Sequence, residues 1–277
     1  MPILATEALS FAYPGGAAAL REVNLAIEPG EFVALLGANG SGKTTLLKHC
    51  NGLLAPEGGR VLLEGEPIVR DRQAEVLRKV GLVFQDPNDQ LFAATVLEDL
   101  LFGPLNLGLP SKEAESKARQ ALKAVGMEGY ENKAIHHLSY GQKKRVAIAG
   151  VLAMEPGILA LDEPTAGLDP AGVEEIMNLL AGLNQRGLTI IMATHDVDLV
   201  PEYASRVHVL HRGTIIFNGT PEDLFREGAL IRRAGLRLPR IGQVFASLPE
   251  KDHPLVERPP FTVRAAREVI LELLGRG

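Results

Sequence analysis

A glycine-rich loop that could hold phosphate is the clearest chemical signal in this sequence. The loop follows an apolar run at 32–36 and leads into a helix-compatible segment. Its glycines would let successive backbone N–H groups converge on a phosphate, and the helix N-terminus would add a partial positive charge. The lysine would reach the β- and γ-phosphates of a nucleotide, and the first threonine would coordinate Mg²⁺. The predicted loop comprises Gly37, Ala38, Asn39, Gly40, Ser41, Gly42, Lys43, Thr44 and Thr45.

A pair of carboxylates forms a second candidate element. The apolar run Ile158–Leu161 ends in Asp162 and Glu163. An acidic residue at a strand end holds the Mg²⁺ shell in P-loop enzymes, so Asp162 is the candidate for that role. Glu163 would then polarise the attacking water. An isolated Asp-Glu pair is more simply a solvated turn, but its position after a phosphate loop favours the catalytic interpretation.

The elements that must position these residues follow an α/β pattern. Short apolar runs bounded by glycine, proline or charge predict buried parallel strands, at 32–36, 80–84, 158–161 and 189–193. Helical patterns alternate with them, at 44–51, 111–125 and 170–184. Two antiparallel pairs are also predicted, one at the edge of the sheet from 3–12 and 20–27, and one over 207–217 that turns at Arg212-Gly213.

Three parts are predicted along the chain. The strand signal disappears between about Asp89 and Ala153, which indicates a helical insertion. Near the end of the chain, Thr262 would cap a helix over 263–274. We therefore predict a P-loop NTPase core with a RecA-like, mostly parallel sheet and an antiparallel β subdomain over 1–88 and 154–222, an α-helical subdomain over 89–153, and a small C-terminal extension over 223–277.

Composition restricts the compartment and the partners. The formal net charge of −5 and the pI near 5.9 argue against a duplex nucleic-acid binder, which usually has a basic face. Cys50 is the only cysteine, so no internal disulfide can form, and a reducing cytosol suits the chain. No run approaches about 18 uncharged apolar residues, and the N-terminus does not resemble a signal peptide. We therefore expect a cytoplasmic protein, and any membrane path that it serves must be formed by other polypeptides.

The sequence resembles ATP-binding-cassette ATPases over nearly all of residues 1–222. The decisive element is LSYGQ at 138–142, which is similar to the LSGGQ signature of the family and lies between the phosphate loop and the acidic strand. Generic P-loop kinases and GTPases lack this element. The remaining motifs follow in the order of the family: Gln85 at a strand end, Gly167-Leu168-Asp169 after the acidic pair, and His195 at the end of the run IIMATH.

This resemblance implies that the protein hydrolyses ATP and that each matching residue has a role. Tyr13 would stack on the adenine, Gln85 would sense Mg²⁺ and the γ-phosphate, and His195 would hold the γ-phosphate and Glu163 in line. The implied catalytic residues are Lys43, Gln85, Glu163 and His195, and the implied Mg²⁺ ligands are Thr44, Gln85 and Asp162.

The signature implies a head-to-tail dimer with two ATP molecules between the subunits. Ser139 and Gly141 would contact the γ-phosphate bound to the opposite subunit, and Gln142 would complete this nucleotide-binding element. The chain departs from the family at Tyr140, where glycine is usual, and at Ala38, where proline is usual. A positive φ at the first of these positions would strain a tyrosine. The basic run at 143–145 is interpreted as the solvated start of the signature helix.

A narrower resemblance is to the energy-coupling-factor ATPases. The run QDPNDQLF at 85–92 is similar to their extra element after the Q-loop, so Asp89, Gln90 and Phe92 would receive a coupling helix of the membrane subunit. The runs at 102–108 and 142–145 are most similar to cobalt-import ATPases. The implied protein powers import of a transition-metal ion, with cobalt favoured over nickel or a vitamin. Its implied partners are a second copy or a paralogous ATPase subunit, an integral membrane coupling subunit and a substrate-binding membrane subunit, with no nucleic acid, at the cytoplasmic face of the membrane.

Two other functions remain open at this point. A cassette ATPase that acts on a soluble partner in DNA repair or translation usually carries a long coiled coil or two cassettes, and neither pattern is visible. A degenerate subunit that only binds nucleotide is the second alternative. The intact Lys43, Asp162, Glu163 and His195 argue against it.

Overall fold

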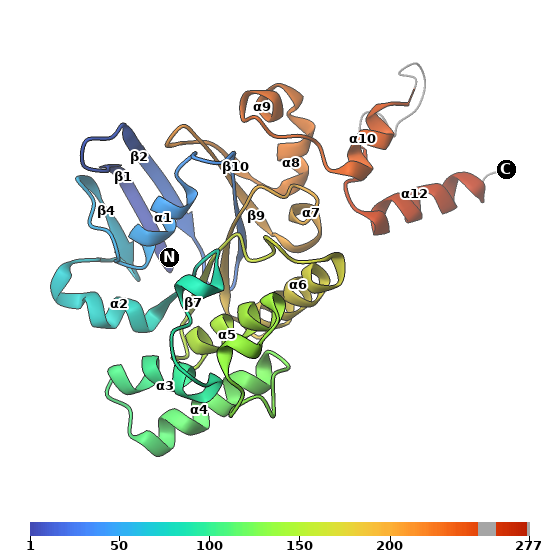
Figure 1. Ribbon diagram of the computed structural model, residues 1–277. Coiled ribbons are helices and arrows are strands. Elements are labelled where there is room, and N and C mark those ends of the chain that lie inside the picture. The colour runs from blue at the N-terminus through green and yellow to red at the C-terminus, as the bar shows by residue number, and fades with distance from the viewer. Residues whose placement is uncertain (249–258, 276–277) are drawn as a thin grey trace.

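The computed structural model describes residues 1–248 and 259–275, and its strands form two sheets (Figure 1). The strands are β1 (Leu4–Ala12), β2 (Ala18–Ile27), β3 (Phe32–Leu36), β4 (Gly58–Leu63), β5 (Glu66–Pro67), β6 (Val80–Val83), β7 (Ile158–Asp162), β8 (Thr189–Thr194), β9 (Arg206–His211) and β10 (Thr214–Gly219). The larger sheet has the order β10-β9-β3-β8-β7-β6 and the smaller one the order β2-β1-β4-β5.

The larger sheet is parallel from β9 to β6, and β10 joins its edge as the antiparallel half of a hairpin with β9. Every residue of β3, β6, β7 and β8 is buried. Strands that are covered on both faces need continuous apolar sequence, which is why these runs could be recognised. The predicted parallel strands and the hairpin turning at Arg212-Gly213 are confirmed.

The predicted position of the N-terminal strands at the edge of this sheet is wrong. β1 and β2 do pair antiparallel, with Leu4 opposite Ile27, but the other side of β1 pairs with β4, with Leu4 opposite Leu63. The N-terminal strands therefore form a separate antiparallel sheet. A hairpin pattern identifies the local partner of a strand, whereas β4 follows β1 only after β2 and β3 and was not predicted.

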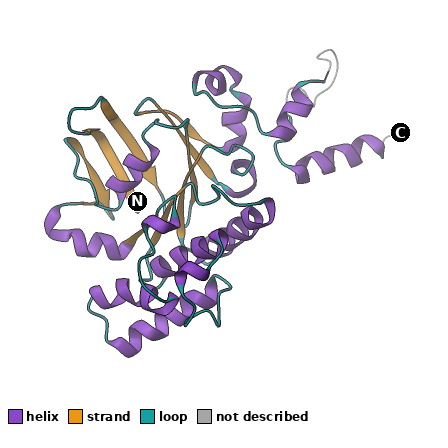
Figure 2. Cartoon of the chain, in the orientation of Figure 1, coloured by secondary structure: helices purple, strands orange, loops and turns teal. Residues whose placement is uncertain are grey.

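Helices occupy the chain between the strands (Figure 2). Their bounds are α1 (Lys43–Cys50), η1 (Arg70–Arg72), α2 (Gln73–Lys79), η2 (Pro87–Asp89), α3 (Val96–Asn106), α4 (Ser111–Ala124), η3 (Ile135–His137), α5 (Tyr140–Leu152), α6 (Pro170–Gln185), α7 (Val200–Tyr203), α8 (Pro221–Arg226), α9 (Gly228–Arg233), α10 (Arg240–Ala246) and α12 (Val263–Leu274), where η marks a 3-10 helix. No helix in the described residues is both long enough and apolar enough to span a bilayer.

The helices α3, α4 and α5 lie together at one end of the molecule, below the two sheets in Figure 1. Two of them begin with reciprocal caps, from Thr95 and Glu98 on α3 and from Ser139 and Gln142 on α5. Such caps satisfy backbone N–H groups that have no partner within the helix. A core of buried apolar residues joins these helices to β7 and β8, so the signature segment packs directly on the strands of the site.

The last part of the chain packs partly on the large sheet. Leu224, Phe225 and Ile231 on α8 and α9 share one buried cluster with Ala34 and Leu36 of β3. Beyond them, α10 and α12 lie to one side of the molecule (Figure 1). The predicted final helix is confirmed, and the Thr262 hydroxyl caps it by accepting from the Ala265 N–H at 3.1 Å. The division into three parts stays a prediction, and residues 249–258 and 276–277 of the predicted extension lie outside the described residues.

Candidate functional site

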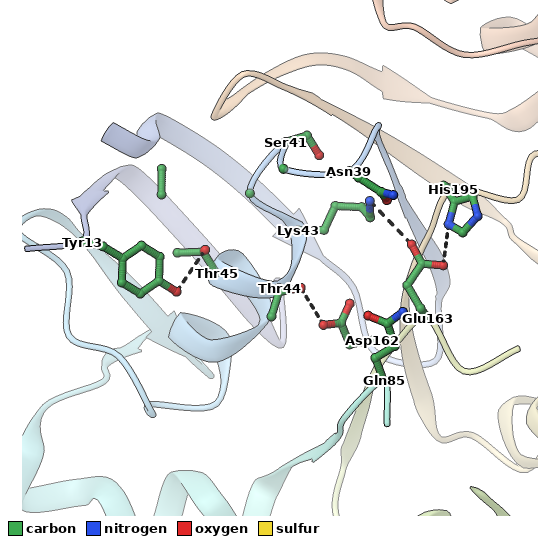
Figure 3. Close-up of a pocket in the computed structure, with 13 residues that line it drawn as sticks. Tyr13, Asn39, Ser41, Lys43, Thr44, Thr45, Gln85, Asp162, Glu163 and His195 are labelled. Atoms are coloured by element: carbon green, nitrogen blue, oxygen red, sulfur yellow. Dashed lines mark hydrogen bonds and ion pairs between the residues drawn. The ribbon is translucent and has the colours of Figure 1, made fainter. Parts of the chain in front are cut away.

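Four neighbouring parallel strands bring the predicted site residues to one edge of the sheet. The phosphate loop follows β3, His195 follows β8, Glu163 follows β7 and Gln85 lies just beyond β6. The carboxyl ends of parallel strands meet at one edge, where ligands bind in open α/β sheets. Here they surround a pocket of about 450 Å³ (Figure 3). Its lining residues are Tyr13, Ala19, Asn39, Gly40, Ser41, Gly42, Lys43, Thr44, Thr45, Gln85, Asp162, Glu163 and His195.

The phosphate loop requires glycine at position 42. Gly42 has φ of 109° at the N-terminus of α1, and a Cβ there would lie 2.7 Å from the Ala19 carbonyl oxygen. Any other residue would be strained by its backbone and would also collide with a backbone atom. The first two loop residues lie beside the pocket: Gly37 is not among its lining residues, and Ala38 lines an adjacent cavity.

Lys43 is a buried cation held inside the loop. Its Nζ donates to the carbonyl oxygens of Gly37 at 2.7 Å and Ala38 at 3.3 Å. The same atom lies 3.6 Å from Glu163 Oε1. The ammonium group therefore stands between the loop backbone and the acidic strand end, at the side of the pocket where Figure 3 shows it pointing toward Glu163.

Thr44 and Asp162 form a hydroxyl–carboxylate pair. Thr44 Oγ1 donates to Asp162 Oδ2 at 2.6 Å, and Asp162 is buried. Burial raises the pKa of Asp162, while the Thr44 hydrogen bond acts in the opposite direction. Hydroxyl and carboxylate oxygens are ligands that Mg²⁺ accepts, usually one or two from protein together with substrate phosphates. A cation here would favour the ionised carboxylate, so the residues present fit Mg²⁺.

Glu163 has an unusual backbone and lies between the side chains of Lys43 and His195. Its φ is +46°, a conformation that few residues other than glycine adopt. Its Oε2 lies 2.9 Å from Nδ1 of His195, which is exposed while Glu163 is buried. Together with Lys43 on Oε1, this arrangement places one carboxylate between a phosphate-loop cation and an imidazole. Such a carboxylate can accept a proton from a water molecule held in the pocket.

Tyr13 stands at the far side of the pocket from the acidic residues (Figure 3). Its hydroxyl lies 3.3 Å from Thr45 Oγ1, and the edge of its ring contacts Phe11, with centroids 5.0 Å apart. The side chain is 42 % exposed. An exposed aromatic ring beside a phosphate loop can stack on a nucleotide base.

The signature residues do not line this pocket. Ser139 caps α5, with its hydroxyl accepting from the Gln142 N–H at 3.3 Å, and Gly141 lies in the first turn. Tyr140 is the first residue of α5 and does not have a positive φ, so the strain considered for a tyrosine here does not arise. Its ring packs against Gly167. The motif thus presents a capped helix N-terminus outside the pocket of its own chain.

The interpretation of 143–145 as a solvated run is wrong for Lys144, which is 3 % exposed. Its Nζ donates to the carbonyl oxygens of Gln85 at 2.9 Å and Glu163 at 3.2 Å. Burial lowers its pKa to about 8. Helical spacing does not single out Lys144, because residues 146–149 are all buried and each of the three basic residues lies three and four positions before two of them.

Comparison with known proteins supports the interpretation of the chain as an ATP-binding-cassette ATPase. The ABC transporter family matches residues 20–166. The chain belongs to this family. It is 54 % identical over 276 residues to the energy-coupling factor transporter ATP-binding protein EcfA of Methanocaldococcus jannaschii, with 99 % of each chain covered. It is 50 % identical to the protein of the same name from Methanococcus maripaludis, again with 99 % of each covered.

Solved structures that resemble this chain belong to the same family of proteins as its sequence relatives. The cbiO1 protein of Clostridium perfringens, described as part of the ABC transporter complex cbiONQ, has a TM-score of 0.76 and 49 % identity, over 88 % of this chain and 98 % of that one. An ATP-binding cassette dimer in a post-hydrolysis state with ADP and Pi has a TM-score of 0.71 and 32 % identity, over 79 % and 98 %. The chain is therefore an ATPase with a P-loop NTPase fold and an ATP-binding subunit of an energy-coupling-factor ABC transporter.

Proposed function

We propose that this chain powers import of a transition-metal ion, most specifically cobalt, through separate membrane subunits at the cytoplasmic face of the membrane. The single observation that carries the ATPase mechanism is the pocket in which Lys43, Asp162, Glu163 and His195 meet. The cargo rests on the similarity of the runs at 102–108 and 142–145 to cobalt-import ATPases. Nickel and a vitamin are the alternative cargoes.

Within the pocket, each side chain has a distinct task. Thr44, Gln85 and Asp162 would hold Mg²⁺, which neutralises charge on the phosphates when bound. Lys43 would bind the β- and γ-phosphates, Tyr13 would stack on the adenine, and the backbone N–H groups of 37–45 would surround the phosphates. Glu163 would orient and deprotonate the attacking water.

His195 fixes the direction of the Glu163 carboxylate. The imidazole lies beside one carboxylate oxygen, and the other oxygen, which is buried, lies beside Lys43. Because His195 is exposed at the rim, it can also contact a γ-phosphate that enters the pocket. Glu163 would therefore act on the water, while His195 would keep the Glu163 carboxylate aligned.

A second subunit would complete each site. Ser139, Gly141 and Gln142 lie outside the pocket of their own chain, at the N-terminus of α5. A helix N-terminus binds anions through its free N–H groups and its dipole. In a head-to-tail dimer with a second copy or a paralogous subunit, these residues would contact the γ-phosphate bound by the partner. The dimeric cassette relative supports the pairing of two such chains.

A groove beside the helical segment is proposed to receive a coupling helix of the membrane subunit. Phe92 and Phe102 are 65 % and 52 % exposed and pack edge to face with centroids 4.7 Å apart. They line a cavity of about 470 Å³ together with Asp89. Gln90 also lines it, but its amide bonds the Phe84 N–H at 3.0 Å and the Ala147 carbonyl at 3.3 Å. Gln90 therefore shapes the groove and is not free for a partner, while Asp89 and the two rings are the proposed contacts.

The substitution Glu163→Gln tests the mechanism. The amide cannot accept a proton, so turnover should fall by about 10²- to 10⁴-fold while ATP binding is retained. The variant should also accumulate as an ATP-bound dimer, which light scattering would detect. Glu174→Gln is the matched control, because Glu174 is exposed on α6, outside the pocket. Steady-state turnover of Glu163→Gln close to that of the control would refute the assignment.

The cargo requires a separate measurement. The complete complex, in proteoliposomes loaded with ATP, would be offered radioactive cobalt, nickel or a vitamin. ATP-dependent uptake of cobalt in preference to nickel supports the proposal. Uptake of a vitamin without metal uptake would contradict the metal assignment and leave the ATPase assignment intact.

A further inference from the structure

Lys144 connects the signature helix to two segments of the ATP site. It is the fifth residue of α5, and its side chain is almost completely buried. The Nζ atom donates to Gln85 O at the end of β6 and to Glu163 O at the end of β7. On a further side, the ring centroid of Tyr140 lies 5.5 Å from Nζ. Lys144 does not line the nucleotide pocket, so any effect on hydrolysis must act through the residues that it holds.

The hydrogen bond from Lys144 to Glu163 stabilises a backbone conformation that is unfavourable by itself. A non-glycine residue at φ +46° persists only where surrounding contacts hold it there. The Glu163 N–H donates to Ala193 O at 2.9 Å, and the Glu163 carbonyl accepts from the Ala166 N–H at 3.1 Å as well as from Lys144. These bonds fix the bend that turns the carboxylate toward Lys43 and His195.

We propose that Lys144 is a positioning residue for ATP hydrolysis. From its place on α5, it holds the backbones of Gln85 and Glu163 in position. This inference rests on the proposed function, because it assigns a task only if Glu163 acts on water. One ammonium group with three donors suits two carbonyl acceptors that lie on different segments. Since an ionised donor makes stronger hydrogen bonds than a neutral one, the charge of Lys144 strengthens its bonds to both carbonyl oxygens.

Carboxylates on the neighbouring segments favour the charged form of Lys144, whereas its burial disfavours that form. Burial lowers the pKa of Lys144 to about 8, while Asp86 after β6 and Asp162 and Glu163 at the end of β7 act in the opposite direction.

The test compares Lys144→Met and Lys144→Gln with Lys143→Met. Lys143 is the adjacent lysine, and its Nζ donates to the exposed Asn88 side chain, so it serves as the matched control. Lys144→Met keeps an unbranched chain but has no donor. We expect its kcat to fall by about 10- to 100-fold, as when a group that orients a reacting residue is removed, with unchanged ATP affinity. Lys144→Gln keeps amide donors without charge, so it should recover much of the rate.

Three results would overturn the proposal. Turnover of Lys144→Met equal to that of Lys143→Met would show that the buried lysine is not needed. Loss of ATP affinity in parallel with kcat would show a general structural role. A Lys144→Gln variant as slow as Lys144→Met would exclude the donors, and if Lys144→Met fails to fold, a Lys144→Gln variant with a kcat about 10- to 100-fold below that of Lys143→Met would do the same. An unmodified chain without ATPase activity would instead refute the proposed function.

Discussion

His208 should make the folded protein sensitive to mild acid. It lies on β9 with no exposed surface, and within the described residues neither ring nitrogen has a hydrogen-bond partner. Burial, with a smaller effect of the Arg206 charge, lowers its pKa from 6.5 to about 4. In the unfolded chain the imidazole takes up a proton near pH 6.5, whereas in the folded protein it stays neutral until about pH 4. Between these values the unfolded state binds more protons, so stability is lost as the pH falls.

The magnitude follows from the two pKa values. Full separation from 6.5 to about 4 corresponds to about 3 kcal/mol, at about 1.4 kcal/mol per pH unit. Between pH 7.5 and pH 5 the loss is about 2 kcal/mol, because protonation of the folded form has hardly begun. Burial also lowers the pKa of His49, which contributes with the same sign. That contribution cancels when the protein is compared with a variant that differs only at 208.

The substitution His208→Leu removes the titrating group and two buried polar atoms without partners. Urea unfolding followed by circular dichroism at pH 7.5 and pH 5, without nucleotide, should show that the variant loses about 2 kcal/mol less than the unmodified protein. His136→Leu is the control, because His136 is exposed. Equal losses in the unmodified protein and His208→Leu would refute the reasoning.

Two further predictions concern binding. Tyr13→Ala should weaken ATP binding by about 5- to 100-fold, the equivalent of one lost base-stacking contact, while Tyr13→Phe should retain affinity. Titration calorimetry measures the affinity of both variants, and full affinity of the alanine variant would place the adenine elsewhere. Phe92→Ala should leave the ATPase activity of the isolated chain unchanged but weaken assembly with the membrane subunit by about tenfold or more, as expected for a buried aromatic anchor. Co-purification measures the assembly, with Phe102→Ala as the matched variant on the same groove, and full assembly of both would place docking at another surface.

Much of the fold and the site could be predicted because both depend on local patterns. A buried parallel strand requires a short apolar run, and the motifs that follow the four central runs must then meet at one sheet edge. The apolar runs therefore predicted the strands whose carboxyl ends lead to Lys43, Gln85, Asp162 and His195. The structure places these residues around one pocket, and their chemical roles stay predictions.

The features that escaped prediction depend on contacts between distant segments. The partner of β1 in the small sheet is β4, and no local pattern identifies it. The side chain of Gln90 is used by Phe84 and Ala147, which only the packing of α5 on β6 brings together. The burial of Lys144 depends on its bonds to the distant Gln85 and Glu163 backbones, and helical spacing alone does not distinguish it from the two basic residues beside it.

The two buried lysines act on different parts of Glu163, and this suggests how the site is prepared before ATP arrives. Lys43 lies beside Oε1, whereas Lys144 bonds the backbone carbonyl and His195 lies beside Oε2. Phosphates that attract Lys43 would leave Oε1 free to bind water. The carboxylate would keep its direction, because Lys144 and His195 do not need to move. In this arrangement, nucleotide binding would uncover Oε1 of the proposed base, and a carboxylate that is already oriented would avoid the cost of ordering it during the reaction.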